Sequence, residues 1–464
     1  MKAPRTYEEI KALSKATGRK IPELLAMSAT NDPVYIMPSQ ALQGRWFAEL
    51  WERFELPDGV HLRRIHYKLV SQPEPLVMPG NGKPYENTDY CWQFLGNASK
   101  AARCLNMVSA SAFVDARNPD PIFNREYSGI ASPRLELFDT SWFLPEIQAN
   151  LADELDDWLF PFIKVRGYEP NDRDHPFHLE LITEKSTMDD VLVPLCQRFG
   201  INYMPMTGFA SITGTINLLQ RVKASGKPGV VLYISDFDPA GSSMPKAVAR
   251  QIEFWRPVYA PENDVVLNPA VLTLDQVKHY NLPPIPIKET DRRQNKFLEH
   301  YGVEGATELD ALEALHPGEL SKIIREAVAP YIDDDSHARV VQAGRSAEKE
   351  AQSVWGQWTD EHWDKWRALK SQVAEVVDAY RERLESLRQA MKTDLEPFHD
   401  ELDSLRQEIK KEFGDLCLRH NLPARPESPL ALPNHFGGMF DSRREYLNQL
   451  DFYHAAGTDM EVQV

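Results

Sequence analysis

The chain has 464 residues, 42% of them hydrophobic and 26% charged, which is ordinary for a globular protein and allows two or three domains. The N-terminus carries no apolar signal segment and no apolar run approaches ~18 residues, which predicts a cytoplasmic protein without membrane spans. The four cysteines are scattered without a CxxC pair, which argues against a zinc site and a disulfide framework. The formal net charge of −17 argues against a simple nucleic-acid binder, because phosphate contacts need Lys and Arg.

The segment 61–68 departs from this acidic average. It holds Arg63, Arg64 and Lys68 and no acidic residue, whereas the acidic excess lies largely in the C-terminal half. Local charge therefore favours a polyanion near Tyr67.

The first 120 residues show helical periodicity interrupted by turn residues. An N-terminal helical segment, residues 1–36, is expected to contain two short helices, at 6–17 and 20–28. A second domain is expected over 37–120. Its amphipathic helices are predicted at 39–54, 61–71 and 87–106, and a strand of a β-hairpin at 108–115. Three helices followed by a β-ribbon are typical of a winged-helix domain that binds DNA.

Residues 121–176 are rich in Pro, Asn and Asp and are expected to be a connector, apart from an amphipathic piece at 145–163. From 177 to 335 the pattern becomes regular, with apolar runs of strand length alternating with helical segments. The expected strands are 177–183, 201–206, 229–235 and 264–272, and the expected helices are 187–199, 210–224 and 243–256. This alternation predicts an α/β domain with a parallel, doubly wound sheet, followed by further helices to about 332.

The C-terminal part has a different period. From Trp366 to Leu416 apolar residues recur every three or four positions for about seven heptads. This spacing predicts a coiled coil or helical hairpin over 345–420, bent or broken near Pro397. Residues 421–464 are expected to be a Pro-rich linker followed by a short docking helix.

Three acidic residues follow two of the predicted strands. Glu184 comes directly after the first strand, and Asp236 and Asp238 follow the apolar run Val230–Ile234. Ligands of a parallel α/β sheet gather beyond the carboxyl ends of its strands, so the three carboxylates converge if these strands are neighbours. Their mutual repulsion is relieved by a hard divalent cation, and Mg²⁺ is the ion that such a set typically holds.

An Asp-x-Asp pair has other interpretations. A lone pair is more often a loop or a helix cap, and haloacid-dehalogenase-like phosphotransferases also place one after a strand. Those phosphotransferases normally have the pair near the start of the domain. Here it follows two β-α units and is preceded by Glu184 at a strand end. This order favours a metal-binding α/β domain other than that of the haloacid-dehalogenase-like phosphotransferases.

Several segments together resemble a known family. They are Glu184-Lys185, Thr207-Gly208-Phe209, Asp236-Phe237-Asp238-Pro239-Ala240-Gly241, Thr273–Pro283 and Glu308–Leu312. They are similar to the Toprim domain of topoisomerase VI A subunits and of the meiotic double-strand-break transesterase. Prokaryotic single-subunit relatives carried on plasmids and phages look most similar. The resemblance covers about residues 40–330, is strongest over a Toprim core at 177–273, and does not include the C-terminal coiled coil.

The same family carries a nucleophilic tyrosine ahead of the Toprim domain, in a motif of Arg, three residues and Tyr. Arg63 and Tyr67 match this motif. On a helix Arg63 and Arg64 share a face with Tyr67, where guanidinium groups favour phenolate and hold a phosphate. Tyr67, Arg63 and Glu184 are therefore the expected catalytic residues, and Arg63, Arg64, Lys68 and Lys185 the expected DNA contacts. Alternatively, Tyr67 is a half-buried helix residue and the arginines only bind phosphate.

The resemblance implies Mg²⁺-dependent breakage of double-stranded DNA by a homodimer, in which the tyrosine of one protomer meets the metal of the other. Because the sequence has no GxxxxGK motif, strand passage driven by ATP would require an ATPase partner in trans. Two alternatives remain open. One is a Toprim nuclease in which water is the nucleophile. The other is a non-catalytic DNA-binding scaffold whose coiled coil recruits partners.

Overall fold

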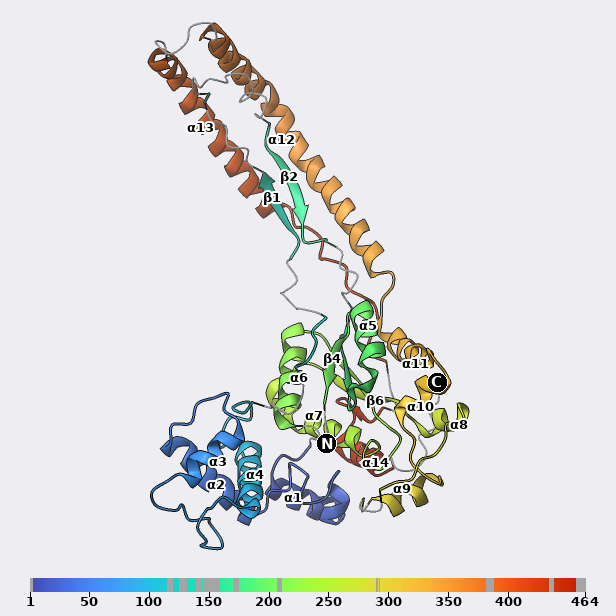
Figure 1. Ribbon diagram of the computed structural model, residues 1–464. Coiled ribbons are helices and arrows are strands. Elements are labelled where there is room, and N and C mark those ends of the chain that lie inside the picture. The colour runs from blue at the N-terminus through green and yellow to red at the C-terminus, as the bar shows by residue number, and fades with distance from the viewer. Residues whose placement is uncertain are drawn as a thin grey trace. The chain divides into compact units, whose positions relative to one another are not determined.

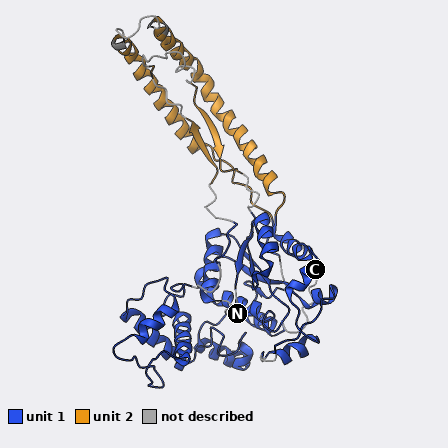
Figure 2. Ribbon diagram, in the orientation of Figure 1, with its two compact units in different colours: residues 1–127, 175–332, 430–464 blue, residues 128–174, 333–429 orange. Residues whose placement is uncertain are grey.

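The chain forms two compact units (Figure 2). The first holds residues 1–127, 175–332 and 430–464, and the second holds 128–174 and 333–429. The residues 121–176 that were expected to be a connector are thus divided between the two units. The computed structural model describes residues 3–114, 120–124, 132–138, 144–145, 159–169, 175–206, 211–288, 291, 293–380, 388–433 and 438–455.

A five-stranded, mostly parallel sheet forms the centre of an α/β domain in the first unit (Figure 1). Its strands are β3 His178–Thr183, β4 Asn202–Pro205, β5 Gly229–Ile234, β6 Val265–Val271 and β7 Phe440–Asp441. The order is β4-β3-β5-β6-β7, and β7 joins β6 in antiparallel orientation. All residues of β3, β4 and β5 are buried, as expected for strands that helices cover on both faces. The predicted α/β class is confirmed, and β3 and β5 are neighbours, which is the condition under which the predicted carboxylates meet.

Helices cover both faces of the sheet, because alternate strand residues point to opposite sides. One face, which includes Ile182 and Tyr233, packs against α6 Ile212–Ser225 and α7 Met244–Tyr259. The other face includes Leu181 and Leu232. It is covered by α5 Asp189–Phe199, α8 Leu274–His279, α9 Gln294–Tyr301, α10 Leu309–Leu315 and α11 Glu319–Val328. The crossover helices α5, α6 and α7 lie where the periodicity predicts them.

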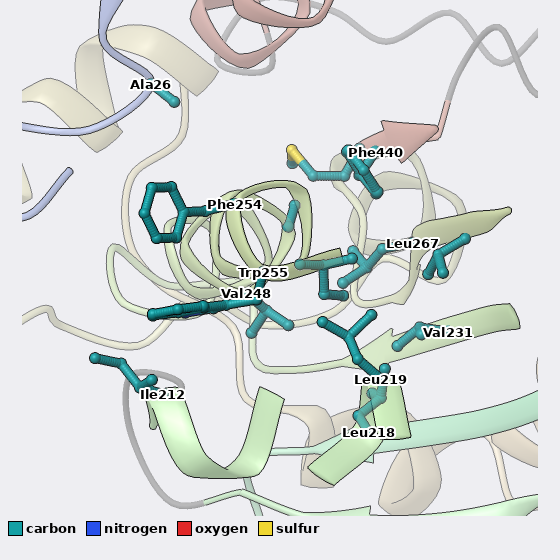
Figure 3. Close-up of a cluster of buried hydrophobic side chains, with 14 of the residues drawn as sticks. Ala26, Ile212, Leu218, Leu219, Val231, Val248, Phe254, Trp255, Leu267 and Phe440 are labelled. Atoms are coloured by element: carbon teal, nitrogen blue, oxygen red, sulfur yellow. The ribbon is translucent and has the colours of Figure 1, made fainter. Parts of the chain in front are cut away.

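The N-terminal and C-terminal segments join the core on the α7 face. Figure 3 shows Ala26 of the N-terminal segment and Phe440 of β7 in the same buried cluster as Phe254 of α7. The N-terminal segment contains α1 Tyr7–Thr17 and a 3-10 turn Ile21–Leu24, and the C-terminal segment contains α14 Tyr446–Ala455. The docking helix predicted after the Pro-rich linker is thus present. The strand β7 that precedes it was not predicted.

A buried ion network ties these segments together. The guanidinium of Arg250 on α7 is 1% exposed and pairs with Asp32 at 3.0 Å and with Glu253 at 2.6 Å. It also donates to Tyr446 Oη at 3.1 Å. Asp32 in turn accepts the backbone N–H groups of Ala26 and Met27 at 2.9 and 3.1 Å. These bonds turn the chain after Leu24, which explains why the helix expected at 20–28 is only a short 3-10 turn.

The helices predicted between residues 37 and 120 form a three-helix bundle. They are α2 Pro38–Arg53, α3 Leu62–Val70 and α4 Asp89–Cys104. Their shared core includes Phe47, Ile65 and Leu95. The β-hairpin strand predicted at 108–115 is wrong over its described part, 108–114, where Phe113 makes a single bridge to Val60. The segment around Val60 is only a short turn between α2 and α3, so it offers no longer edge for pairing.

The second unit is a helical hairpin with a small β-ribbon (Figure 1). Helices α12 Ser336–Tyr380 and α13 Arg388–Arg419 share an apolar core that includes Val373, Leu395 and Leu405. The ribbon, β1 Arg134–Phe138 and β2 Phe162–Arg166, packs on α12. The predicted hairpin is confirmed. Of the bend or break predicted near Pro397, the break is wrong, because α13 continues through this residue. Core residues on both sides of Pro397 hold the helix against α12. Most of the piece predicted at 145–163 lies outside the described residues.

Among the described residues, no helix combines the length and the apolar character needed to cross a membrane.

Candidate functional site

The three predicted carboxylates lie at the carboxyl edge of the sheet. Glu184 follows β3, and its backbone N–H donates to the carbonyl of Ile234 at the end of β5 at 3.3 Å. Asp236 and Asp238 follow β5 directly, so the parallel pairing of β3 with β5 places all three side chains at one edge. Burial raises the pKa of Glu184 to about 7, and the negative charges of Asp238 and Asp236 add to this rise. The electrostatic coupling agrees with the predicted convergence.

The backbone after β5 explains how two aspartates two residues apart face the same way. Phe237, which lies between them, points into the core against Phe297 and Tyr301. Its backbone N–H and C=O pair with those of Thr307 at 2.9 and 2.8 Å. Asp236 and Asp238 therefore project from the opposite side of this extended piece.

A tight turn follows Asp238. Its Oδ1 accepts the backbone N–H of Gly241 at 2.5 Å. A Cβ atom on residue 241 would lie 2.1 Å from the carbonyl oxygen of Asp236, a distance that no side chain tolerates. The glycine that ends the Asp-Phe-Asp-Pro-Ala-Gly motif is thus required for the chain to turn back toward α7.

Lys185 is the nearest cation to this cluster. Its Nζ lies 2.8 Å from Asp236 Oδ2, 3.0 Å from Glu308 Oε2 and 3.3 Å from Asp310 Oδ2. Although partial burial lowers the pKa of Lys185, its hydrogen bonds to Asp236 and Glu308 raise it overall. Lys185 was predicted to contact DNA. Its ammonium is engaged by three carboxylates of its own chain, so a phosphate would have to compete with them.

Asp236 is the most enclosed of the three carboxylates, and both of its oxygens have partners. Oδ1 accepts the backbone N–H of Leu309, at the start of α10, at 2.7 Å. Oδ2 pairs with Lys185. Burial raises the pKa of Asp236, while these two donors act in the opposite direction. The segment 308–310 therefore belongs to the site through its backbone as well as its side chains.

Arg293 supplies a second cation, near Glu184 and Asp238. Its guanidinium donates to Asp291 at 2.9 and 2.8 Å and to Ser243 Oγ at 3.1 Å. The hydrogen bonds to Asp291 raise the pKa of Arg293, and the charges of Asp238 and Glu184 contribute to the rise. The sequence analysis missed Arg293, because no spacing relates it to the strands that carry the carboxylates.

The chemistry of the cluster suits a hard cation such as Mg²⁺, which prefers carboxylate oxygen ligands. In the arrangement that the structure describes, however, no three His, Cys, Asp or Glu side chains are grouped so as to hold one metal ion. Lys185 and the N–H of Leu309 engage both oxygens of Asp236, so a metal ion would have to compete with them for this carboxylate.

The predicted nucleophile lies on the outward face of α3. Tyr67 is 53% exposed, and Arg63, Arg64 and Lys68 are exposed beside it. Among the described residues, neither arginine side chain has an ion-pair or hydrogen-bond partner. Lys68 Nζ donates to the carbonyl of Phe54 at 2.9 Å. The outward face of α3 is thus basic, with a phenol in its middle.

His66 points away from this face, as expected for the residue next to Tyr67 on a helix. It is buried and hydrogen-bonds Tyr85 Oη at 2.7 Å and Asn87 Oδ1 at 3.1 Å. Within the described part of the chain, no hydrogen bond or ring contact joins Tyr67 to Glu184, Asp236 or Asp238. One chain thus contains a carboxylate cluster on the sheet and a basic tyrosine face on the bundle.

The motif Thr207-Gly208-Phe209 lies outside the described residues. No protein-family model matches the chain, and a search of curated proteins finds no significant match. The Toprim and winged-helix assignments therefore stay predictions.

Proposed function

We propose that this chain breaks double-stranded DNA at a Toprim-type site, with Tyr67 as the nucleophile and Mg²⁺ held by Glu184, Asp236 and Asp238. The observation that carries the proposal is that these carboxylates follow adjacent parallel strands at the same edge of the sheet, near enough for their charges to interact. Ligands of open α/β sheets gather at this edge. Mg²⁺ in such sites binds phosphate oxygens as well as carboxylates, so a phosphodiester is the substrate class that suits it.

The exposed face of α3 supports Tyr67 as the nucleophile. Arg63 and Arg64 lie one helical turn before it, and all three are exposed. These two guanidinium groups, which have no side-chain partner among the described residues, would offset the charge of a phosphate and favour phenolate over phenol. The resemblance to topoisomerase VI A subunits implies that Tyr67 of one protomer would act with the carboxylates of a second. The proposed enzyme is therefore a homodimer.

The proposed reaction is a transesterification. Tyr67 Oη forms a bond to phosphorus as the bond from phosphorus to the deoxyribose oxygen breaks. The phenol proton passes to solvent, and the departing oxygen takes up a proton. The products are a phosphotyrosyl bond and a free hydroxyl on the other strand end. When bound, Mg²⁺ supplies positive charge to oxygens on which negative charge develops.

A hydrolytic nuclease is the second candidate, and it is favoured by the separation of Tyr67 from the carboxylates, since within the described residues no hydrogen bond or ring contact joins them. Water is then the nucleophile in place of the phenol. It attacks phosphorus, and Tyr67 and its arginines only hold the DNA. The two functions share the carboxylates and differ in whether DNA ends stay attached to protein.

Cleavage of supercoiled plasmid separates these functions. The full chain is incubated with plasmid and Mg²⁺ and then denatured with and without protease. Transesterification predicts nicked or linear DNA that enters the gel only after proteolysis, lost in Tyr67→Phe and in Asp236→Ala. Tyr90→Phe is the matched control, because Tyr90 is also exposed, at 56%, on the neighbouring helix α4.

Free cleaved DNA that persists in Tyr67→Phe and disappears in Asp236→Ala would instead establish the nuclease. If the plasmid stays intact with Mg²⁺ and with Mn²⁺, both catalytic proposals are refuted and a DNA-binding scaffold remains. Retention of the plasmid by wild type but not by Arg63→Ala/Arg64→Ala would then identify the binding face.

A further inference from the structure

We propose, building on the metal site proposed above, that Lys185 is a tethered cation that occupies Asp236 and yields it to a divalent ion, with Glu308 and Asp310 holding the lysine afterwards. Lys185 is then a positioning residue that sets how tightly the carboxylates bind the ion. Three features of the structure carry this assignment.

The first feature is the set of three carboxylates around one ammonium. Lys185 Nζ lies within 3.3 Å of an oxygen of Asp236, Glu308 and Asp310 at the same time. An ammonium has three N–H donors, so each carboxylate can accept one. Leaving Asp236 would cost Lys185 one of three partners, and Glu308 and Asp310 would still accept the other two N–H groups.

The second feature is the gradient of exposure among these partners. The side chain of Asp236 is 10% exposed, whereas those of Asp310 and Glu308 are 41% and 50% exposed. A carboxylate in the enclosed position needs a cation more than the two at the rim do, because water does not solvate it. Lys185 supplies that cation in the metal-free protein, and a divalent ion at Asp236 would take its place and repel it toward the rim.

The third feature is that the backbone of Lys185 is held in place. Thr183 Oγ1 donates to the carbonyl of Lys185 at 3.1 Å, and the N–H of Lys185 donates to the same hydroxyl at 3.3 Å. Asp310 is also held, since it accepts the hydroxyl of Thr187 at 3.4 Å. The exchange therefore involves the end of the lysine side chain rather than the strand that carries Glu184.

Titration calorimetry of Mn²⁺ and Mg²⁺ into the full-length chain without DNA tests this exchange. Lys185→Met removes the competing cation, so we expect Mn²⁺ to bind about tenfold more tightly than to wild type, a coupling of ordinary size for linked sites. Glu308→Gln/Asp310→Asn removes the alternative partners of the lysine and leaves it on Asp236. This double variant should bind Mn²⁺ several-fold more weakly.

Lys185→Arg is the matched control, because it keeps the positive charge and should stay near wild-type affinity. Thermal melting without metal establishes that each variant is folded. If Lys185→Met does not fold, the double variant alone decides, and unchanged or tighter binding by it refutes the exchange. Unchanged or weaker binding by a folded Lys185→Met also refutes it.

The metal titration and the plasmid-cleavage assay test the lysine exchange and the proposed DNA cleavage separately. Tighter binding by Lys185→Met in a protein that never cuts plasmid would support the lysine exchange and refute the catalytic function. If neither wild type nor Lys185→Met binds either ion, the metal site and the exchange are both refuted. Cleavage of DNA with equal ion affinity in wild type and Lys185→Met would refute the exchange alone.

Discussion

Replacing Glu184 by Gln should make the metal-free protein more stable at alkaline pH. The carboxyl group of Glu184 has its pKa raised from 4.5 to about 7, first by burial and then by Asp238 and Asp236. The folded state thus favours the protonated, neutral form. Its stabilising contribution is fully present below pH 4.5 and is lost as the pH rises through about 7. Gln mimics the neutral form at every pH.

The size of the effect follows from the pKa. A rise from 4.5 to about 7 corresponds to roughly 3 kcal/mol of stability at 1.36 kcal/mol per pH unit. Glu184 is only partly buried, and water screens its repulsion, so we expect about 1–2 kcal/mol at pH 8. For a unit of this size, each kcal/mol shifts the melting temperature by roughly 2–4 °C.

The assay is thermal melting in EDTA at pH 5.5 and pH 8. Glu184→Gln should melt several degrees above wild type at pH 8, and the difference should shrink at pH 5.5. Glu52→Gln is the matched control, because Glu52 is exposed on α2 and has no side-chain partner among the described residues. If wild type and Glu184→Gln show the same dependence on pH, the three carboxylates do not repel one another in the folded protein, and the reasoning fails.

Two substitutions test the framework of the site. Gly241→Ala would place Cβ 2.1 Å from the carbonyl oxygen of Asp236, so it should cost about 2–4 kcal/mol in stability, seen as a lowered melting temperature. Gly356→Ala, where a Cβ meets nothing within 4 Å on a helix, should be neutral or stabilise slightly, and equal losses in both would contradict the steric explanation. Arg250→Met strands the buried Asp32 without its cation, which should destabilise the protein by about 3–5 kcal/mol in urea unfolding. A loss smaller than about 1 kcal/mol would mean that the network is not needed for stability.

Local sequence patterns predicted the elements that carry the carboxylates. The apolar runs that became β3 and β5 are long enough for strands and too short for buried helices, and turn residues bound them. The pattern also placed Glu184 and Asp236 just after strand ends, but their proximity depended on the two strands being neighbours, which the structure shows. The same periodicity predicted the three helices α2, α3 and α4, whereas the 53% exposure of Tyr67 on α3 came from the structure.

Contacts between residues that are distant in sequence could be identified only from the tertiary structure. Lys185 meets Glu308 across 123 residues, and Arg250 meets Asp32 across 218, and no periodic pattern relates such positions. The edge strand β7 was missed because it has only two residues and gains its stability from β6 rather than from its own sequence. The strand expected at 108–115 failed for the converse reason, since a β-pattern needs a neighbouring edge.

The acidic cluster shows which features of a site can be predicted from sequence and which require the tertiary structure. The sequence by itself determined which carboxylates follow a strand end, because strand ends are set by local apolar runs, and ligands of parallel sheets gather at those ends. Only the tertiary structure decided that β3 and β5 are neighbours and which groups surround each carboxylate. Asp236 is satisfied by Lys185 and by the N–H of Leu309, and Glu184 has its pKa raised to about 7. Burial and the distances between charges set these properties, and both arise only when distant segments pack together.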